Sequence, residues 1–341
     1  MKKIRLFSYF KYIRVQIAAY YLVASIIIIS IMGMVLYYSL TNVMRDDALE
    51  NTKYALEESG GSIELYVEKL KAISQIMASN KDVIAYLQFQ DESLRQSAQE
   101  LLINVMETDK NLLTGILVSK TGNVLSTDAS LDMSISSDMM REPWYIDVME
   151  KGSMPVLTSA RRQVFSMDKS QWVISIGREI TDDQGNHMGL LILDFSYAVI
   201  ERFLQNLNLG NEGFAFILTD NGELVYHDDM SYFETSSQSS ELVSIQKMPS
   251  GYDRGTGKLT HQVDISGTGW CLGGGSSLDH LAVARRQLLE AIALVAILLT
   301  GIAIGSGYLI ATRISGPIRQ LEEAMNRFSE GSLDVASIPN S

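Results

Sequence analysis

An uncharged apolar run, Ala291 to Ala311, constrains this chain more than any other feature of its sequence. At about 1.5 Å per residue, a helix over these residues spans roughly 31 Å, which matches the hydrocarbon thickness of a bilayer. We therefore predict a membrane-spanning helix over residues 287–312. Everything before it is then anchored to a membrane.

A second apolar run extends from Val15 to about Leu40. It is too long for the core of a cleavable signal peptide, and no small-residue cleavage site follows it, so we predict a retained membrane helix over residues 15–40. Residues 1–14 carry five basic side chains and no acidic one, which predicts that this end is cytoplasmic. The expected protein is a two-pass cell-membrane protein with residues 41–286 extracytoplasmic.

The chain turns amphipathic directly after the second run. Apolar residues recur there with spacings of 4, 3, 4 and 3, at Ile314, Ile318, Leu321, Met325 and Phe328. Such a heptad seam needs a partner helix, so we expect a homodimer. With Pro317 and Gly331-Ser-Leu333, residues 313–341 resemble the start of a HAMP linker, the signal relay of bacterial transmembrane receptors. The alternative is an ordinary amphipathic helix beside the membrane.

Composition excludes several classes of function. The net charge of −12 gives no general basic surface for nucleic acid, and the single cysteine, Cys271, permits no internal disulfide. The four histidines are isolated, so we expect no metal site and no cofactor. No nucleophile elbow or phosphate loop is present, and no histidine follows the second membrane segment, so these residues predict no enzyme. Gly273–Ser277 is interpreted as a flexible joint.

The predicted extracytoplasmic segment starts with the apolar spacing of a helix, and the spacing then changes to that of strands. Long helices are expected over about 41–77 and 91–106. A strand, a Gly-containing turn and a returning strand are predicted at 112–127. The same strand–turn–strand pattern recurs at 214–227, where Gly222 takes the place of Gly122. This internal repeat predicts two antiparallel-sheet modules, a distal one over about 108–206 and a proximal one over about 207–284.

The order of these features resembles a double Cache sensor domain. The resemblance is carried by Trp144-Tyr145, by the strand from Gly189 to Asp194 and by the phrase from Gly213 to Leu224. It implies an α+β fold, with a long membrane-proximal helix and two tandem PAS-like modules between two membrane helices and a partial HAMP helix. The greatest likeness is to sensor histidine kinases of Gram-positive bacteria with a LytS-like kinase. The implied function is signal transduction in a two-component system, with a response regulator as downstream partner.

Two alternatives stay open. One is the front half of a methyl-accepting chemoreceptor, and the other is a membrane-tethered structural protein without a ligand. For a receptor, the resemblance implies a small-molecule site in the distal module, where aromatic rings and Arg hold a carboxylate and Asp pairs with an amine. The candidate ligand-binding residues are Trp144, Tyr145, Arg161, Arg162 and Asp194. In amino-acid-binding members the resemblance implies Arg-x-Trp-Tyr, whereas Arg141-Glu-Pro-Trp has one residue more between the Arg and the Trp. A sugar and an amino acid are therefore both expected ligands.

Overall fold

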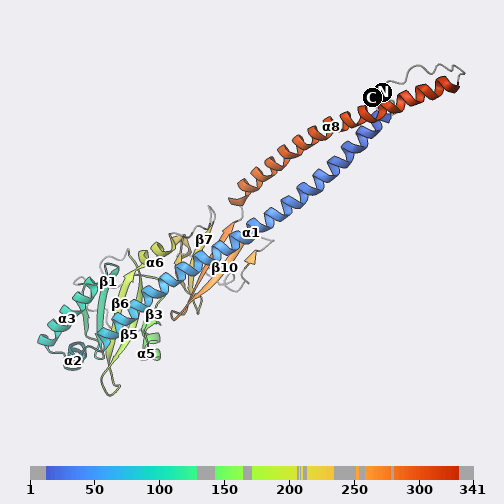
Figure 1. Ribbon diagram of the computed structural model, residues 1–341. Helices are drawn as coiled ribbons and strands as arrows, with labels where there is room; N and C mark the ends of the chain where they lie inside the picture. The colour runs from blue at the N-terminus through green and yellow to red at the C-terminus, as the bar shows by residue number, and fades with distance from the viewer. Residues whose placement is uncertain are drawn as a thin grey trace, which may run out of the picture. The chain divides into compact units, whose positions relative to one another are not determined.

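The computed structural model describes residues 13–128, 143–163, 171–205, 207, 209, 213–233, 251–252, 258–277 and 280–329. The chain divides into two compact units (Figure 1). One unit joins Met1–Asp46 to Leu281–Ser341, and the other is Asp47–His280. Each unit is described by itself below.

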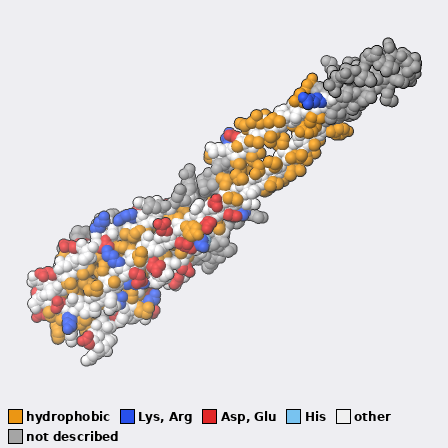
Figure 2. Space-filling view, in the orientation of Figure 1, with side chains coloured by type: hydrophobic (Ala, Val, Ile, Leu, Met, Phe, Trp, Pro, Cys, Tyr) orange, Lys and Arg blue, Asp and Glu red, His pale blue; other side chains and the backbone are white. Residues whose placement is uncertain are grey.

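The first unit contains two helical segments that are long and apolar enough to cross a membrane. They belong to α1 (Ile13–Ala78) and α8 (His280–Ser329), and their candidate spans fall within Ala19–Ala78 and Arg286–Ile310. Their apolar side chains are largely exposed, and Figure 2 shows this apolar surface in orange. An exposed apolar surface of this extent is what a helix in lipid presents.

The second unit starts with helices. The part of α1 in this unit buries one face, on which Ile63, Val67, Leu70 and Met77 are fully buried and Ile73 is half-buried. Two short helices follow, α2 (Lys81–Phe89) and α3 (Glu92–Glu107). Asn80 and Asp91 cap them, since each side chain accepts hydrogen bonds from backbone N–H groups of the first turn.

The distal sheet is antiparallel, with the strand order β2-β1-β6-β5-β3 and a short strand, β4, also paired to β5. Its strands are β1 (Leu112–Ser119), β2 (Val124–Ser126), β3 (Val156–Leu157), β4 (Arg161–Arg162), β5 (Trp172–Thr181) and β6 (His187–Ser196). Helix α5 (Pro143–Lys151) packs on β5 and β3, and α6 (Tyr197–Leu204) follows β6. The central strands β1, β5 and β6 are almost entirely buried.

The proximal sheet repeats this topology with the order β8-β7-β11-β10-β9. Its strands are β7 (Phe214–Thr219), β8 (Leu224–His227), β9 (Gly251–Tyr252), β10 (Lys258–Ile265) and β11 (Trp270–Ser277). A short 3-10 helix, η3 (Met230–Phe233), follows β8. Gly122 and Gly222, which end the matching turns, both have positive φ, at 87° and 81°. The predicted α+β architecture with two antiparallel sheets is confirmed.

One sequence-based interpretation is wrong. Gly273–Ser277 is not a flexible joint, because these residues are the last five of β11. All of them pair with β10, and the three glycines also pair with β7. Glycines are required there because neighbouring side chains fill the space. A Cβ on Gly274 would lie 2.8 Å from Leu56, and the ring of Phe216 lies over Gly273. A glycine run in a strand therefore marks close packing here rather than flexibility.

Candidate ligand-binding site in the distal module

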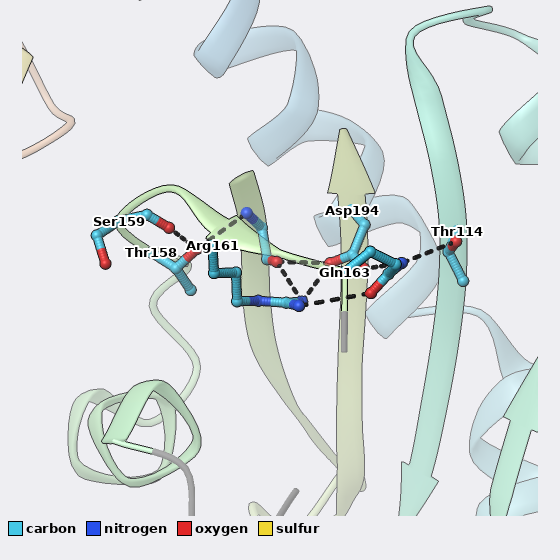
Figure 3. Close-up of polar contacts among 7 residues, drawn as sticks. Thr114, Thr158, Ser159, Arg161, Gln163 and Asp194 are labelled. Atoms are coloured by element: carbon cyan, nitrogen blue, oxygen red, sulfur yellow. Dashed lines mark hydrogen bonds and ion pairs between the residues drawn. The ribbon is translucent and has the colours of Figure 1, made fainter. Parts of the chain in front are cut away.

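A buried carboxylate lies at the centre of the distal sheet. Asp194 is on β6, is 0% exposed, and pairs across the sheet with Thr114 on β1 and Ser175 on β5. Its Oδ1 accepts hydrogen bonds from Arg161 Nη2 at 2.8 Å and from Ser175 Oγ at 2.5 Å. Its Oδ2 accepts one from Gln163 Nε2 at 2.9 Å, as Figure 3 shows. These donors compensate a charge that would otherwise be costly to bury.

Arg161 connects this carboxylate to the aromatic part of the site. It lies on β4, whose two residues pair only with β5, and its guanidinium also donates to Ser175 Oγ at 2.9 Å. The Cζ atom of Arg161 lies 5.9 Å from the ring centroid of Trp144, within the range of a cation–π contact. Trp144, Arg161 and Asp194 are therefore brought together from α5, β4 and β6.

Tyr145 and Arg162 take different positions. Tyr145 is half-buried and makes an edge-on contact with Trp144, at 6.1 Å between ring centroids. Burial raises the pKa of Tyr145, and the nearby carboxylate of Glu179 adds to this effect, so its hydroxyl stays protonated at neutral pH. Arg162 is exposed and lies over Trp172, with its Cζ 5.4 Å from that ring. Among the described residues, the side-chain donors to Asp194 are Arg161, Gln163 and Ser175, and Arg162 is not one of them.

Sequence reasoning missed the polar residues that complete the network. Gln163 is buried and also donates to Thr114 Oγ1 at 3.3 Å, while Thr158 Oγ1 accepts the backbone N–H of Ser175 at 3.0 Å. Ser175 and Thr114 are isolated polar residues within otherwise apolar strands. That pattern is a usable signal, because a polar group inside a buried strand requires a partner.

A cavity of about 270 Å³ reaches this network from one side. Trp144, Thr158 and Arg161 contribute to its walls, whereas Asp194 does not. The turns of the proximal sheet close the other side, with Asp220 and Trp270 among the lining residues. Its volume is just below the roughly 300 Å³ at which small-molecule sites begin. Residues 129–142, which include Arg141, and residues 164–170 lie outside the described part of the chain.

The described residues contain no group of His, Cys, Asp and Glu side chains that could hold a metal ion. The groups that this candidate site offers to a ligand are the ion pair, the amide, the hydroxyls and the rings. A buried carboxylate and a half-buried guanidinium are suited to groups of opposite charge on one small molecule.

Comparison with known proteins places this fold. Methyl-accepting chemotaxis protein McpC of Bacillus subtilis is 21% identical over 329 residues, which cover 96% of this chain and 49% of that protein. Chemotaxis protein McpB of the same organism is 25% identical over 209 residues, covering 58% of this chain and 29% of that protein. The chain thus spans about half, or less, of the length of these curated relatives.

Solved structures show the same architecture. The sensory domain of the Campylobacter jejuni chemoreceptor Tlp3 with isoleucine bound has a TM-score of 0.53 at 16% identity, covering 70% of this chain and 96% of that one. The ligand-binding domain of the Pseudomonas fluorescens chemoreceptor CtaA in complex with L-isoleucine has a TM-score of 0.54 at 18% identity, covering 72% and 99%.

The family of this chain is shown by a match to a family model that covers most of the sequence. The Cache domain model matches residues 40–281, which is well over half of the sequence. This range includes α1 from residue 40 onward, both sheets and the candidate site around Asp194. The relatives named above are chemotaxis receptors, as in the chemoreceptor alternative, rather than kinases. By this match the chain belongs to the Cache domain family.

Proposed function

We propose that this chain is the sensory part of a two-pass membrane receptor of the chemoreceptor type, and that its distal module binds a small α-amino acid outside the cell. The observation that carries the proposal is the buried Asp194, paired with Arg161 beside Trp144. The basic residues 1–14 support the orientation, since basic segments are retained on the cytoplasmic side.

The geometry suits a zwitterion. Oδ1 of Asp194 already has two donors and Oδ2 has one, so an incoming ammonium group competes with Arg161 for this carboxylate. The guanidinium that is released then meets the ligand's carboxylate, and positive and negative groups alternate from Asp194 through the ligand to Arg161. Strand β4 pairs with β5 at only two positions, so a movement of Arg161 breaks few backbone pairs of the sheet, and the two charges of the ligand replace the ion pair that is given up.

The ligands of the structural neighbours support an amino acid over a sugar. Tlp3 was solved with isoleucine and CtaA with L-isoleucine, and both share the fold of this chain. A sugar has no charged groups to exchange with the Asp194–Arg161 pair, so it gains less at this site. A structural protein without a ligand does not require a buried ion pair next to a cavity.

For the output, we propose a methyl-accepting chemotaxis domain, because the curated relatives of this chain are chemotaxis proteins. A LytS-like kinase with its response regulator is the other output that suits the same front half. Helix α8 runs from His280 to Ser329 and so includes the seam that resembles a HAMP linker. A seam of this kind is completed by a second copy of the chain, so we propose a homodimer.

Calorimetry on the full chain in lipid nanodiscs tests the proposed ligand class. L-isoleucine and L-valine are expected to bind, whereas isovalerate, which lacks the amine, and isobutylamine, which lacks the carboxylate, are expected to bind at least tenfold more weakly. Asp194→Asn should weaken L-isoleucine at least tenfold. Asp183→Asn, in an exposed turn, is the matched control and should bind normally.

Two results contradict the proposal. Binding of L-isoleucine that is equal in Asp194→Asn and in the unaltered chain removes Asp194 from the site. Binding of glucose or maltose in place of every amino acid tried identifies the site as one for sugars.

A further inference from the structure

Arg178 is a buried cation that the proposed binding step does not use. It lies on β5, is 7% exposed, and its three hydrogen bonds to described residues all go to neutral groups. Within the part of the chain that the structure describes, no Asp or Glu forms an ion pair with it. Burial lowers the pKa of this guanidinium, which reflects the cost of holding the charge there.

The three bonds of Arg178 join separate segments. Its Nε donates to Ser74 Oγ at 3.0 Å, and its Nη1 donates to Gln75 Oε1 at 2.6 Å. Both residues lie in the last two turns of α1, more than 100 positions away. The same Nη1 donates to the backbone oxygen of Ser153 at 2.6 Å, directly after α5. Ser74 is itself fixed, since its hydroxyl donates to the carbonyl of Lys71 at 2.8 Å.

The segment that Arg178 holds is the one that carries the candidate site's rings. Helix α5 bears Trp144 and Tyr145, and it packs on β5 without a gap at the residue next to Arg178. A Cβ on Gly177 would lie 2.6 Å from Val148 of α5. Ser175, which donates to Asp194, lies three residues before Arg178 on the same strand. Arg178 therefore bonds the residue Ser153 that follows α5, and it shares strand β5 with Ser175, a hydrogen-bond partner of Asp194.

We propose that Arg178 is the positioning residue that transmits a change in the distal site to the outer end of α1, through its simultaneous bonds to Ser153, Ser74 and Gln75. A planar guanidinium bonds two segments at fixed angles, whereas the rotatable ammonium of a lysine holds them less rigidly. This inference rests on the proposed function, because it assigns Arg178 a role in relaying ligand binding rather than in binding the ligand.

Hydrogen–deuterium exchange on the full chain in nanodiscs tests this role, with residues 70–79 as the reporter peptide. Two perturbations of the site are used, saturating L-isoleucine and, without any ligand, the substitution Asp194→Asn. In the unaltered chain each should change the exchange rate of the reporter by threefold or more. In Arg178→Met that response should disappear, while the affinity for L-isoleucine changes by less than threefold. Arg178→Lys should restore part of the response.

The outcomes separate this inference from the proposed function. If L-isoleucine does not bind the unaltered chain, the proposed ligand class fails. The exchange measured in Asp194→Asn then still tests whether Arg178 transmits a change in the site to α1. If the response persists in Arg178→Met, or if Asp194→Asn leaves the reporter unchanged in the unaltered chain, the relay is wrong. If Arg178→Met does not fold, Gln75→Leu and Ser74→Ala remove the α1 end of the bridge, and an undiminished response in both overturns the proposal.

Discussion

Gly275 occupies in the proximal sheet the position that Asp194 occupies in the distal sheet. Asp194 pairs with Thr114, and Gly275 pairs with Phe214, which is the residue equivalent to Thr114 when Gly122 is aligned with Gly222. The ring of Phe214 fills the space that the side chain takes in the distal module, since a Cβ on Gly275 would lie 2.6 Å from it. The two modules share a topology, and the described part of the proximal one has an aromatic ring in place of the charged centre.

Adding a methyl group at this position tests the packing. Gly275→Ala is expected to lower the free energy of unfolding by about 1–3 kcal/mol, because the ring of Phe214 must move to admit it. Thermal unfolding of the full chain, followed by circular dichroism, measures the effect. Gly61→Ala is the control, since no atom lies within 4 Å of its added Cβ. It should stabilise α1 by up to about 1 kcal/mol, and a loss of stability equal to that of Gly275→Ala would contradict the explanation.

The Asp194–Arg161 pair should show strong thermodynamic coupling. Asp194→Asn leaves the Arg161 guanidinium without its counter-ion, and Arg161→Met leaves a fully buried carboxylate, so each single change should cost about 3–5 kcal/mol. The double variant removes both charges and should cost less than the sum of the two. Urea unfolding of the four proteins gives the coupling free energy, and strictly additive costs would show that the pair is not an energetic unit.

Asp109 should make the fold sensitive to acid. Burial alone raises its pKa, but Lys69 at 2.9 Å and the Asn111 backbone N–H, also at 2.9 Å, outweigh this and hold the pKa below the ordinary value of about 3.9. The stabilisation is therefore complete above about pH 4 and is lost as the pH falls through the lowered pKa. Unfolding of Asp109→Asn between pH 2 and 5 should depend less on pH than that of the unaltered chain, whereas Asp183→Asn should leave the dependence unchanged.

His227 should make the stability of the fold depend on pH at higher pH values than Asp109 does. Its ring is 4% exposed and stacks on Tyr232 at 3.8 Å, and its Nδ1 accepts the backbone N–H of Asp229. Burial lowers the pKa of His227, although Asp228 and Asp229 oppose this. The unfolded chain then takes up a proton near pH 6.5 before the folded chain does, so stability should fall as the pH drops below about 6.5.

His227→Phe should reduce that slope when melting temperatures are compared between pH 7.5 and 5.5. Part of the slope should remain, because burial also lowers the pKa of His261. An unchanged slope in His227→Phe would show that the histidine is protonated as easily in the folded chain as in the unfolded one.

Local patterns predicted most of the elements but only part of the site. Turn glycines and apolar runs predicted the strands, and Asp194 was recognisable as a charge at the end of an apolar strand. The choice between Arg161 and Arg162 was not predictable, because successive residues of a strand point to opposite faces and the register of β4 is set by β5. The roles of Ser175 and Gln163 depend on strand order, which joins β1, β6 and β5 across long stretches of sequence.

The error at Gly273–Ser277 has the same origin. Whether glycines in a strand mark flexibility or close packing depends on the neighbouring strand. Here the rings of Phe214 and Phe216 on β7 occupy the space beside the glycines of β11. The end of the predicted HAMP segment, from residue 330 on, lies outside the described residues.

In the binding mode proposed above, the contact between Arg161 and Asp194 sets the concentration range in which the receptor responds. An empty site that already satisfies its own charges gives up a 2.8 Å ion pair whenever a solute enters, so the net gain on occupancy is small. Weak occupancy with rapid release suits a detector that compares successive moments in a changing environment, since a site that held its solute tightly would stay full after the surroundings had become dilute.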